Sequence, residues 1–400
     1  MTTEPRAAVR QPLWFMLLLA LAVAGGAVAY VPFLTVLLPL RIAELTGSND
    51  VAALSYVTFA GAIVASLANI GFGWLSDRSG RRRRWIATGL VLSCAMLLAT
   101  TQARNVTELI LLIMGWQLAL NMMLGPLAAW AGDCVPDGQK GVLGGLFAFA
   151  PALGALSAAL VTTPGLAADQ MRLVLVAVLV TAMVSPALIL GVGRELPQLM
   201  QPHMPEPAGE NDTARAPAPV ARMWLARLLV QIAEAALFAF LLFWLRSLAP
   251  GYGENAAARI FSVVLVVAVP LALFAGRWSD RVQRPMLPLA VCAGLSTLGL
   301  VAMALADRLE PAIAGYMLFG IASVVFLSLH SSQTLRVLPR PATRGRDLGL
   351  FNLTNTIPSL IIPWLTLSLV PVFGFAGLFW VLAVLCGIAA LLIAALAGKR

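Results

Sequence analysis

Two stretches of the sequence, Gly73-Trp-Leu-Ser-Asp-Arg78 and Gly276-Arg-Trp-Ser-Asp-Arg281, share the pattern Gly-x-x-Ser-Asp-Arg. Their aspartates, Asp77 and Asp280, lie 203 residues apart in a chain of 400. Each stretch follows a long apolar run and precedes another one. The spacing therefore suggests that the chain consists of two related halves.

A second pair of loops tests whether this repeat is a coincidence. Val135-Pro136 and Lys140-Gly141 correspond to Leu338-Pro339 and Arg344-Gly345, at offsets of 203 and 204 residues. Chance does not readily make two different loops repeat at one offset. We interpret the pattern as the duplication of a unit of about half the chain.

The composition places both halves in a lipid bilayer. Hydrophobic residues make up 60% of the chain and charged residues only 11%, and the mean hydropathy is +0.89. Soluble domains have about 25% charged residues. The apolar runs are too long and too uniformly apolar for the alternating strands of a membrane barrel. The sequence predicts an all-α membrane protein, since helices satisfy their own backbone hydrogen bonds in lipid.

Twelve membrane spans are expected, six in each half. An N-terminal bundle of six helices covers residues 1–192, a cytoplasmic linker rich in Pro and Ala covers 193–222, and a C-terminal bundle covers 223–400. The spans are predicted at 13–40, 51–72, 86–103, 107–131, 141–164, 171–192, 223–247, 257–276, 286–306, 311–335, 347–369 and 371–397.

The positions of Lys and Arg predict the orientation. With the N-terminus inside the cell, 21 of the 27 basic residues fall in cytoplasmic segments, among them Arg222 and Arg227 at the start of the seventh span. Cytoplasmic loops concentrate Lys and Arg, so both termini are expected in the cytoplasm, and the expected location is a bacterial inner membrane. The net charge of +9 is explained by these loops, and no nucleic-acid partner is expected.

The loop Gly73-Trp-Leu-Ser-Asp-Arg-Ser-Gly-Arg-Arg82 resembles the signature loop between the second and third helices of the major facilitator superfamily. Within that superfamily, Asn121, Ala131-Gly-Asp-Cys-Val-Pro-Asp-Gly-Gln-Lys-Gly141 and Arg344-Gly-Arg-Asp-Leu-Gly-Leu-Phe-Asn352 are similar to stretches of the glycoside and sucrose-type cation symporters. The resemblance implies two homologous six-helix bundles with a substrate site between them near the midplane. It also implies transport of a sugar or glycoside.

Ala150-Pro-Ala-Leu-Gly-Ala155 favours a second interpretation, because it resembles the glycine-proline motif of drug-proton antiporters with alanine at two glycine positions. The fourth span, however, lacks the membrane-embedded arginine of those exporters. An exporter of drugs or metabolites therefore stays as the alternative to the symporter.

The repeated loops predict cytoplasmic gating residues, namely Asp77, Arg78, Asp280 and Arg281. A carboxylate at such a turn can accept hydrogen bonds from the N-terminus of a neighbouring helix and pair with arginine. We expect Asp77 and Arg78 to latch the two halves on the cytoplasmic side. The following run, Arg82 to Arg84, is expected to serve only the membrane orientation.

Glu234, near the middle of the seventh span, is the strongest candidate for function, because an ionisable group inside a membrane span is costly. It has no Lys or Arg within four residues. Distance from water favours the protonated carboxyl, so Glu234 is a candidate for proton coupling or for accepting hydrogen bonds from substrate hydroxyls. A buried structural carboxyl is the alternative. Gln231 lies one turn earlier on the same face.

Other polar residues within spans complete the predicted substrate site. Gln117 and Asn121 share a face of the fourth span beside Trp116, which could stack on a sugar ring, although two amides could equally hydrogen bond between helices. The complete predicted set is Tyr30, Trp116, Gln117, Asn121, Gln231, Glu234 and Asn355.

The sequence thus predicts a secondary transporter that moves a small polar solute together with a proton rather than sodium. It is expected to act as a monomer in the bilayer by alternating access. The chain has no GxxxxGK[ST] nucleotide-binding sequence and no HExxH or GxSxG motif, so ATP-driven pumping and enzymatic activity are not expected. No cofactor and no metal are expected.

Overall fold

The computed structural model of the chain describes residues 10–47, 51–163, 165–166, 168, 171–191, 217–249, 252, 254–338 and 343–397. These residues are almost entirely α-helical. Eleven helices in the described part are long and apolar enough to cross a membrane, by length and composition. The predicted all-α membrane fold is confirmed.

The first half contains six spans. The first is continuous through a π-helical turn, η1, that directly follows Pro32, where proline cannot supply the usual backbone N–H. The elements are α1 Leu13–Pro32, η1 Phe33–Leu37, α2 Leu38–Thr46, α3 Val51–Ser79, α4 Arg82–Ala99, η2 Thr100–Gln102, α5 Val106–Cys134, η3 Asp137–Gln139, α6 Lys140–Phe147, α7 Phe149–Val161 and α8 Arg172–Leu190.

The second half repeats this plan with longer helices. Its elements are α10 Pro217–Leu248, α11 Glu254–Val282, α12 Leu287–Ala304, α13 Leu309–Val337 and α14 Arg344–Ala397. The predicted linker lies mostly outside the described residues. Its last part differs from the prediction, since α10 already begins at Pro217, and proline fits the first turn of a helix.

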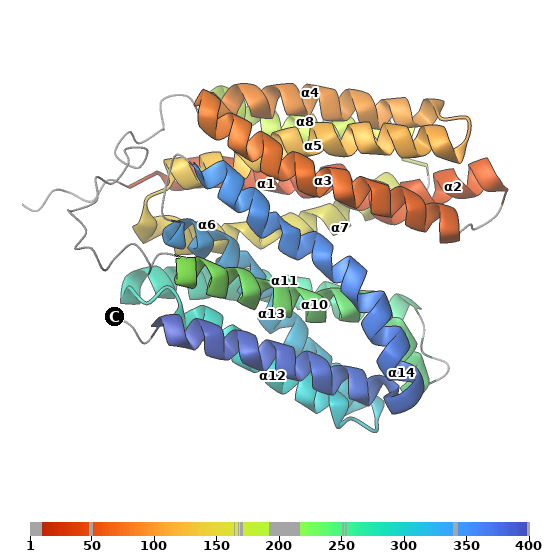
Figure 1. Cartoon of the computed structure of the whole chain (residues 1–400), viewed down its shortest axis with the longest axis vertical. Helices are drawn as coiled ribbons and strands as arrows, with labels where there is room; N and C mark the ends of the chain where they lie inside the picture. Colours follow the sequence, from red (N-terminus) through yellow and green to blue (C-terminus); the bar gives the residue numbers. More distant parts are fainter. Residues whose placement is uncertain are drawn as a thin grey trace, which may run out of the picture.

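Twelve spans were expected, and the eleven in the described residues include Ser368–Ala397 but not the expected span at 347–369. Both of the last two expected spans fall within one helical element, α14. Its backbone leaves the helical region at Gly374, where φ is 64° and ψ is −173°. Glycine adopts a positive φ without steric cost, so the element bends there. Figure 1 shows the two limbs of α14 running in different directions from this bend. The smaller number of counted spans is therefore compatible with the expected architecture.

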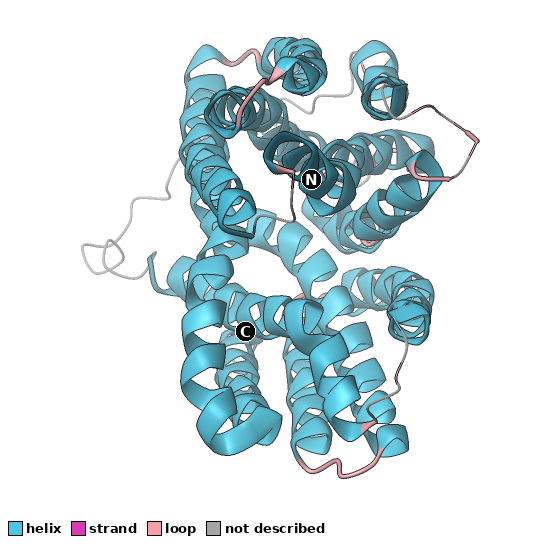
Figure 2. Cartoon of the chain, turned by 90° about the vertical axis from the view of Figure 1, so that its right-hand side faces the viewer, coloured by secondary structure: helices cyan, strands magenta, loops and turns pink. Residues whose placement is uncertain are grey.

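Each half has a hydrophobic core of its own. One core consists of buried residues between Phe15 and Ala187, and the other runs mainly from Met223 to Ile393. The two groups of helices lie one above the other in Figure 1 and are seen end-on in Figure 2. Between the halves, α3 packs against α14, and α6 packs against α11 and α13. These inter-half contacts position the site described below.

Close helix packing inside the second half depends on Gly299 of α12. A β-carbon added there would lie 2.6 Å from the backbone nitrogen of Phe319 and 2.8 Å from the carbonyl oxygen of Gly315. Both atoms belong to the backbone of α13, which cannot move aside as a flexible side chain can. Small residues are typical of helix contacts in membranes for this reason.

We predict that Gly299→Ala destabilises the second half by about 1–3 kcal/mol, the usual cost of overpacking. The matched control is Gly294→Ala in the same helix, since nothing lies within 4 Å of a β-carbon at that position. Thermal unfolding in detergent measures both. A Gly299→Ala melting temperature no lower than that of the control would contradict the packing described here.

Candidate functional site

A cavity of about 700 Å³ lies between the two halves. Helices of both halves line it, and most of its surface is apolar with a limited set of polar groups, as in small-molecule sites generally. Its polar lining residues are Tyr30, Thr58, Asn69, Gln117, Asn121, Arg227, Gln231, Glu234, Ser328, Ser331, Thr334, Asn352, Asn355 and Thr356. Six of the seven residues predicted for the substrate site are in this lining.

One face of α10 supplies the two charged groups of the cavity. Arg227, Gln231 and Glu234 follow one another at spacings of four and three residues, which places them on one side of a helix. Seven residues of helix rise by about 10 Å. The arginine and the glutamate therefore lie two turns apart on the same wall.

The guanidinium of Arg227 is held by neutral acceptors from α13 and α14. Its Nε donates to Thr354 Oγ1 at 3.0 Å, and its Nη1 donates to Ser331 Oγ at 3.0 Å and to the carbonyl oxygen of Leu327 at 3.4 Å. Its Nη2 donates to Asn355 Oδ1 at 3.4 Å. These hydrogen bonds fix the orientation of the planar guanidinium relative to α13 and α14.

The placement of Arg227 corrects the sequence interpretation, which had assigned this residue to a cytoplasmic segment. The helix begins ten residues earlier, at Pro217, so Arg227 is well inside it. Within four residues of Glu234 the sequence has no Lys or Arg. A spacing of seven residues returns to the same helix face, and this signal could have found the arginine.

Glu234 faces the cavity and is half-buried. Its Oε2 accepts a hydrogen bond of 2.8 Å from Gln231 Nε2. The Oε1 of Gln231 is buried and has no partner in the described structure. This free acceptor stands beside a carboxyl group that can gain a proton, and rotation of the amide would present it to a protonated Glu234.

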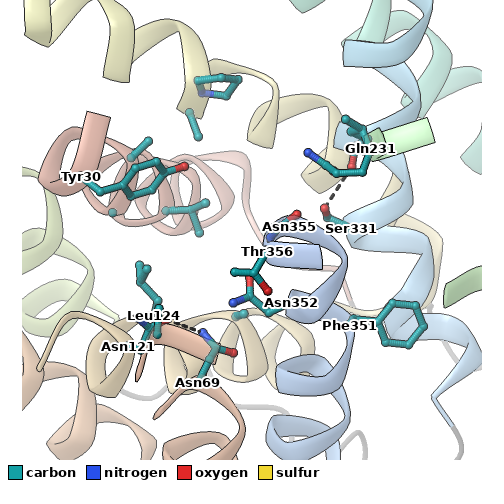
Figure 3. Close-up of a pocket in the computed structure, with 18 of the residues that line it drawn as sticks. Tyr30, Asn69, Asn121, Leu124, Gln231, Ser331, Phe351, Asn352, Asn355 and Thr356 are labelled. Atoms are coloured by element: carbon teal, nitrogen blue, oxygen red, sulfur yellow. Dashed lines mark hydrogen bonds between the residues drawn. The ribbon is translucent and has the colours of Figure 1, made fainter. Parts of the chain in front are cut away.

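Amide groups of the first half form the opposite wall. Asn69 Nδ2 donates to Asn121 Oδ1 at 2.9 Å, and Asn121 Nδ2 donates to the carbonyl oxygen of Gln117 at 2.9 Å. Figure 3 shows Asn69 and Asn121 joined beneath Tyr30, whose ring points into the open space. The sequence interpretation missed Asn69, an isolated amide in an apolar span.

The first limb of α14 brings further amides to the cavity. Asn355 Nδ2 donates to Asn352 Oδ1 at 2.7 Å, so the two side chains are coupled. Thr356 Oγ1 lies 3.0 Å from Ser66 Oγ of α3, a direct hydrogen bond between the halves. Asn355 is therefore placed as predicted, with Asn352 beside it in the lining.

Trp116 is the predicted substrate residue that the structure does not bring to the cavity. Its side chain is fully buried in the core of the first half, edge-on to Phe33 at a centroid distance of 4.9 Å. Large aromatic rings commonly fill cores in this way. We therefore withdraw the stacking role. His330 is also fully buried, with Nε2 3.0 Å from the carbonyl oxygen of Met223.

Two junctions join the halves at one end of the cavity. In the first, Asp77 at the end of α3 accepts hydrogen bonds from the backbone N–H groups of Gly345 and Arg346, at 2.9 Å and 3.0 Å. These groups belong to the first turn of α14. A carboxylate at a helix N-terminus is stabilised by the unpaired N–H groups there.

The second junction repeats the first with the halves exchanged. Asp280 of α11 accepts hydrogen bonds from the backbone N–H groups of Gly141 and Val142 at the start of α6, at 3.1 Å and 3.0 Å. Close approach is possible because Gly276 packs against Gly141. The duplicated loops thus make reciprocal contacts between the halves.

A buried charge network reinforces the first junction. Arg82 pairs with Asp77 at 2.8 Å and also with Asp133, while Arg344 of the opposite half reaches Asp133 at 2.6 Å. The side chain of Asp133 is 2% exposed. At the duplicated positions, 203 residues later, the sequence has Pro285 and Arg336 in place of Arg82 and Asp133.

Two expectations about the arginines are therefore corrected. Arg78 is exposed and lies over the ring of Trp74 at 5.8 Å, and Arg281 is exposed as well. Arg82, expected to serve only the orientation, is the arginine inside the junction. It starts a new helix, and its side chain can turn back toward Ser76 and Asp77.

We predict that Asp133→Ala destabilises the chain by about 3–5 kcal/mol, because it leaves two buried guanidinium groups without their shared carboxylate. Arg78→Ala, which changes an exposed arginine four residues before the new helix, is the control and should melt as the unchanged chain does. Thermal unfolding in detergent reads both. Equal melting temperatures for the two variants would show that the network contributes little.

Comparison with known proteins agrees with this geometry. The sequence profile of the Major Facilitator Superfamily matches residues 223–400. No curated protein matches the sequence.

Three solved structures share the fold over nearly their whole lengths. The proton:xylose symporter XylE is 14% identical with a TM-score of 0.71, covering 94% of each chain. The human organic anion transporter MFSD10 is 13% identical with a TM-score of 0.73, covering 96% of this chain and 100% of its own. A bacterial homologue of the iron transporter ferroportin is 16% identical with a TM-score of 0.72, covering 97% and 99%.

At such low identities the solved structures establish the fold and leave the cargo open. The profile match supplies an independent sequence signal in the second half. The resemblance noted from the duplicated loops is confirmed, and this chain has the fold of the major facilitator transporters.

Proposed function

We propose that this chain is a proton-coupled secondary transporter of a small polar solute, with a sugar or glycoside as the favoured class. The observation that carries the proposal is the cavity between the halves, in which a half-buried carboxyl faces a wall of amides. Transporters of this plan bind substrate near the midplane between their repeats.

The amide wall supports a substrate rich in hydroxyl groups. Asn69, Gln117 and Asn121 on one side and Asn352 and Asn355 on the other offer donors and acceptors at fixed positions. Sugar hydroxyls both donate and accept, so they match amides better than purely apolar or purely cationic solutes do. The fold shared with a proton:xylose symporter is consistent with this class.

Glu234 supports coupling to protons. A carboxyl group with one neutral partner, Gln231, can bind and release a proton without breaking an ion pair. Alternating access then requires that the transporter exchange substrate and proton on both sides of the membrane. The two junctions at Asp77 and Asp280 would be formed in only one of the two conformations, the one open to the opposite side. We assign the junction end to the cytoplasmic side, with both termini in the cytoplasm.

Export of a drug or metabolite is the second candidate function. The organic anion transporter and the ferroportin homologue have the same fold as the xylose symporter, so the fold does not decide between import and export. Uptake of labelled xylose, glucose and sucrose into cells that express the chain, compared with drug resistance of the same cells, separates the two.

We predict that Glu234→Gln abolishes proton-driven accumulation while substrate exchange without a proton gradient continues. The amide cannot carry a proton but keeps the shape of the side chain. Proteoliposomes with an internal pH dye measure proton entry when each of the three sugars is added. Glu310→Gln, which neutralises an exposed carboxyl in the first turn of α13, is the control. Unchanged accumulation by Glu234→Gln would overturn the coupling assignment.

We also predict that Asp77→Asn combined with Asp280→Asn opens the junction end. Neutral amides remove the charge that the helix N-termini stabilise. Leu348 lines the cavity one turn after Gly345. The rate at which a Leu348→Cys variant is labelled therefore reports how easily a reagent enters the cavity from the junction end. A membrane-impermeant maleimide should label it several-fold faster in the double variant than in Leu348→Cys alone, and equal rates would contradict the latch.

A further inference from the structure

We propose that the guanidinium of Arg227 is an anion site within the cavity and that the solute carries one carboxylate beside its hydroxyl groups, as a sugar acid does. This inference deepens the proposed function, on which it rests, by naming the charge of the cargo. It is carried by the contacts of one side chain and by the way charge is distributed between the two walls.

The first observation is that Arg227 has no carboxylate partner. Its hydrogen-bond acceptors are two hydroxyls, one carbonyl oxygen and one amide oxygen. No carboxylate of the described residues lies within 4.0 Å of its guanidinium, in contrast to Arg82 and Arg344, which share Asp133. Arginine stays charged in proteins, so a full positive charge stands inside the cavity.

Such a charge is costly in a membrane unless something compensates for it. Charged side chains within spans are rare, and they pair with each other or mark the path of a substrate. The two Arg227 contacts that would be displaced most easily are the longest ones, at 3.4 Å, to Asn355 Oδ1 and to the carbonyl oxygen of Leu327. A carboxylate replacing the contact with Asn355 would form a charge-assisted hydrogen bond, which is about twice as strong as a neutral one.

The second observation is that the two charged groups among the described lining residues lie on one wall. Arg227 and Glu234 belong to α10, whereas the opposite wall offers Tyr30 and the neutral amides of Asn69, Gln117 and Asn121. A solute with a charged end and a hydroxylated body fits this arrangement in one orientation. The carboxylate meets Arg227, and the hydroxyls meet the amides.

Glu234 explains why such an anion would travel with a proton. When Glu234 is ionised, the wall is neutral overall, and a bound carboxylate would give it a net negative charge. When Glu234 is protonated, the wall has a net charge of +1, which a monovalent anion cancels. Anion and proton are therefore taken up together, and the loaded transporter carries no more charge than the empty one. Transport of the acid is then electroneutral.

Few other groups in the described structure could supply the same pH dependence. Glu234 interacts electrostatically with Arg227 on its own helix, with Tyr30 of α1 and with Tyr316 of α13. Tyrosine ordinarily titrates near pH 10. His330 of α13 interacts with Arg227, but it is fully buried and is absent from the cavity lining.

The test is binding of matched acids and neutral sugars to the purified full chain at pH 5.5, by calorimetry or thermal shift. The pairs are glucuronate with glucose, galacturonate with galactose, and gluconate with sorbitol. In at least one pair, we expect the acid to bind about tenfold more tightly than its neutral partner, as expected for a hydrogen bond to a charged group. Arg227→Gln should lose this preference and Arg227→Lys should keep part of it.

Arg222→Gln, which removes a charge from the same helix outside the cavity lining, is the control and should keep the preference. Size-exclusion profiles of all variants verify folding, and Arg227→Lys keeps the test open if Arg227→Gln misfolds. Equal binding within every pair, no binding of any acid, or a preference that survives both Arg227 substitutions would overturn the inference.

The two levels of the proposal fail differently. If neutral sugars bind and are taken up with protons but acids gain nothing, the anion site is refuted and the proposed function stands. If acids bind through Arg227 but their uptake brings no proton into proteoliposomes, the coupling through Glu234 is refuted and the anion site stands.

Discussion

The arrangement of the two halves depends on carboxylates that accept hydrogen bonds from backbone N–H groups at helix N-termini of the opposite half. Asp77 binds the first turn of α14, and Asp280 binds the first turn of α6. The first N–H groups of a helix have no partner within the helix, so each contact satisfies a helix end and joins the halves at once. The cavity lies between the halves that these contacts hold together.

The two junctions are alike in their backbone contacts. The first also contains the buried network of Arg82, Asp133 and Arg344. The cavity is asymmetric in the same sense, because α10 supplies both its cation and its carboxyl group while the facing wall is neutral. The described lining thus differs between the two halves: the first half presents neutral polar groups, and α10 of the second half presents an arginine and a glutamate.

Much of the fold could be predicted because the bilayer imposes a simple pattern. Long apolar runs, a repeat at 203 residues and the duplicated loops led to the right architecture, and six of seven expected site residues line the cavity. The errors were local. Trp116 was placed in the site because it neighbours two amides in sequence, but adjacent residues on a helix point about 100° apart. Arg227 was missed because a charged residue near a helix end was assumed to be outside the membrane.

The sequence by itself determined the class of the protein, the number of repeats and the identity of the acid in the seventh span, because composition and periodicity are properties of the chain. The tertiary structure alone decided which polar groups face one another. It showed that Arg82, not Arg78, enters the junction with Asp77, and that Arg227 reaches the cavity without a carboxylate beside it. Partners of a side chain come from distant helices, and only packing in three dimensions brings these together.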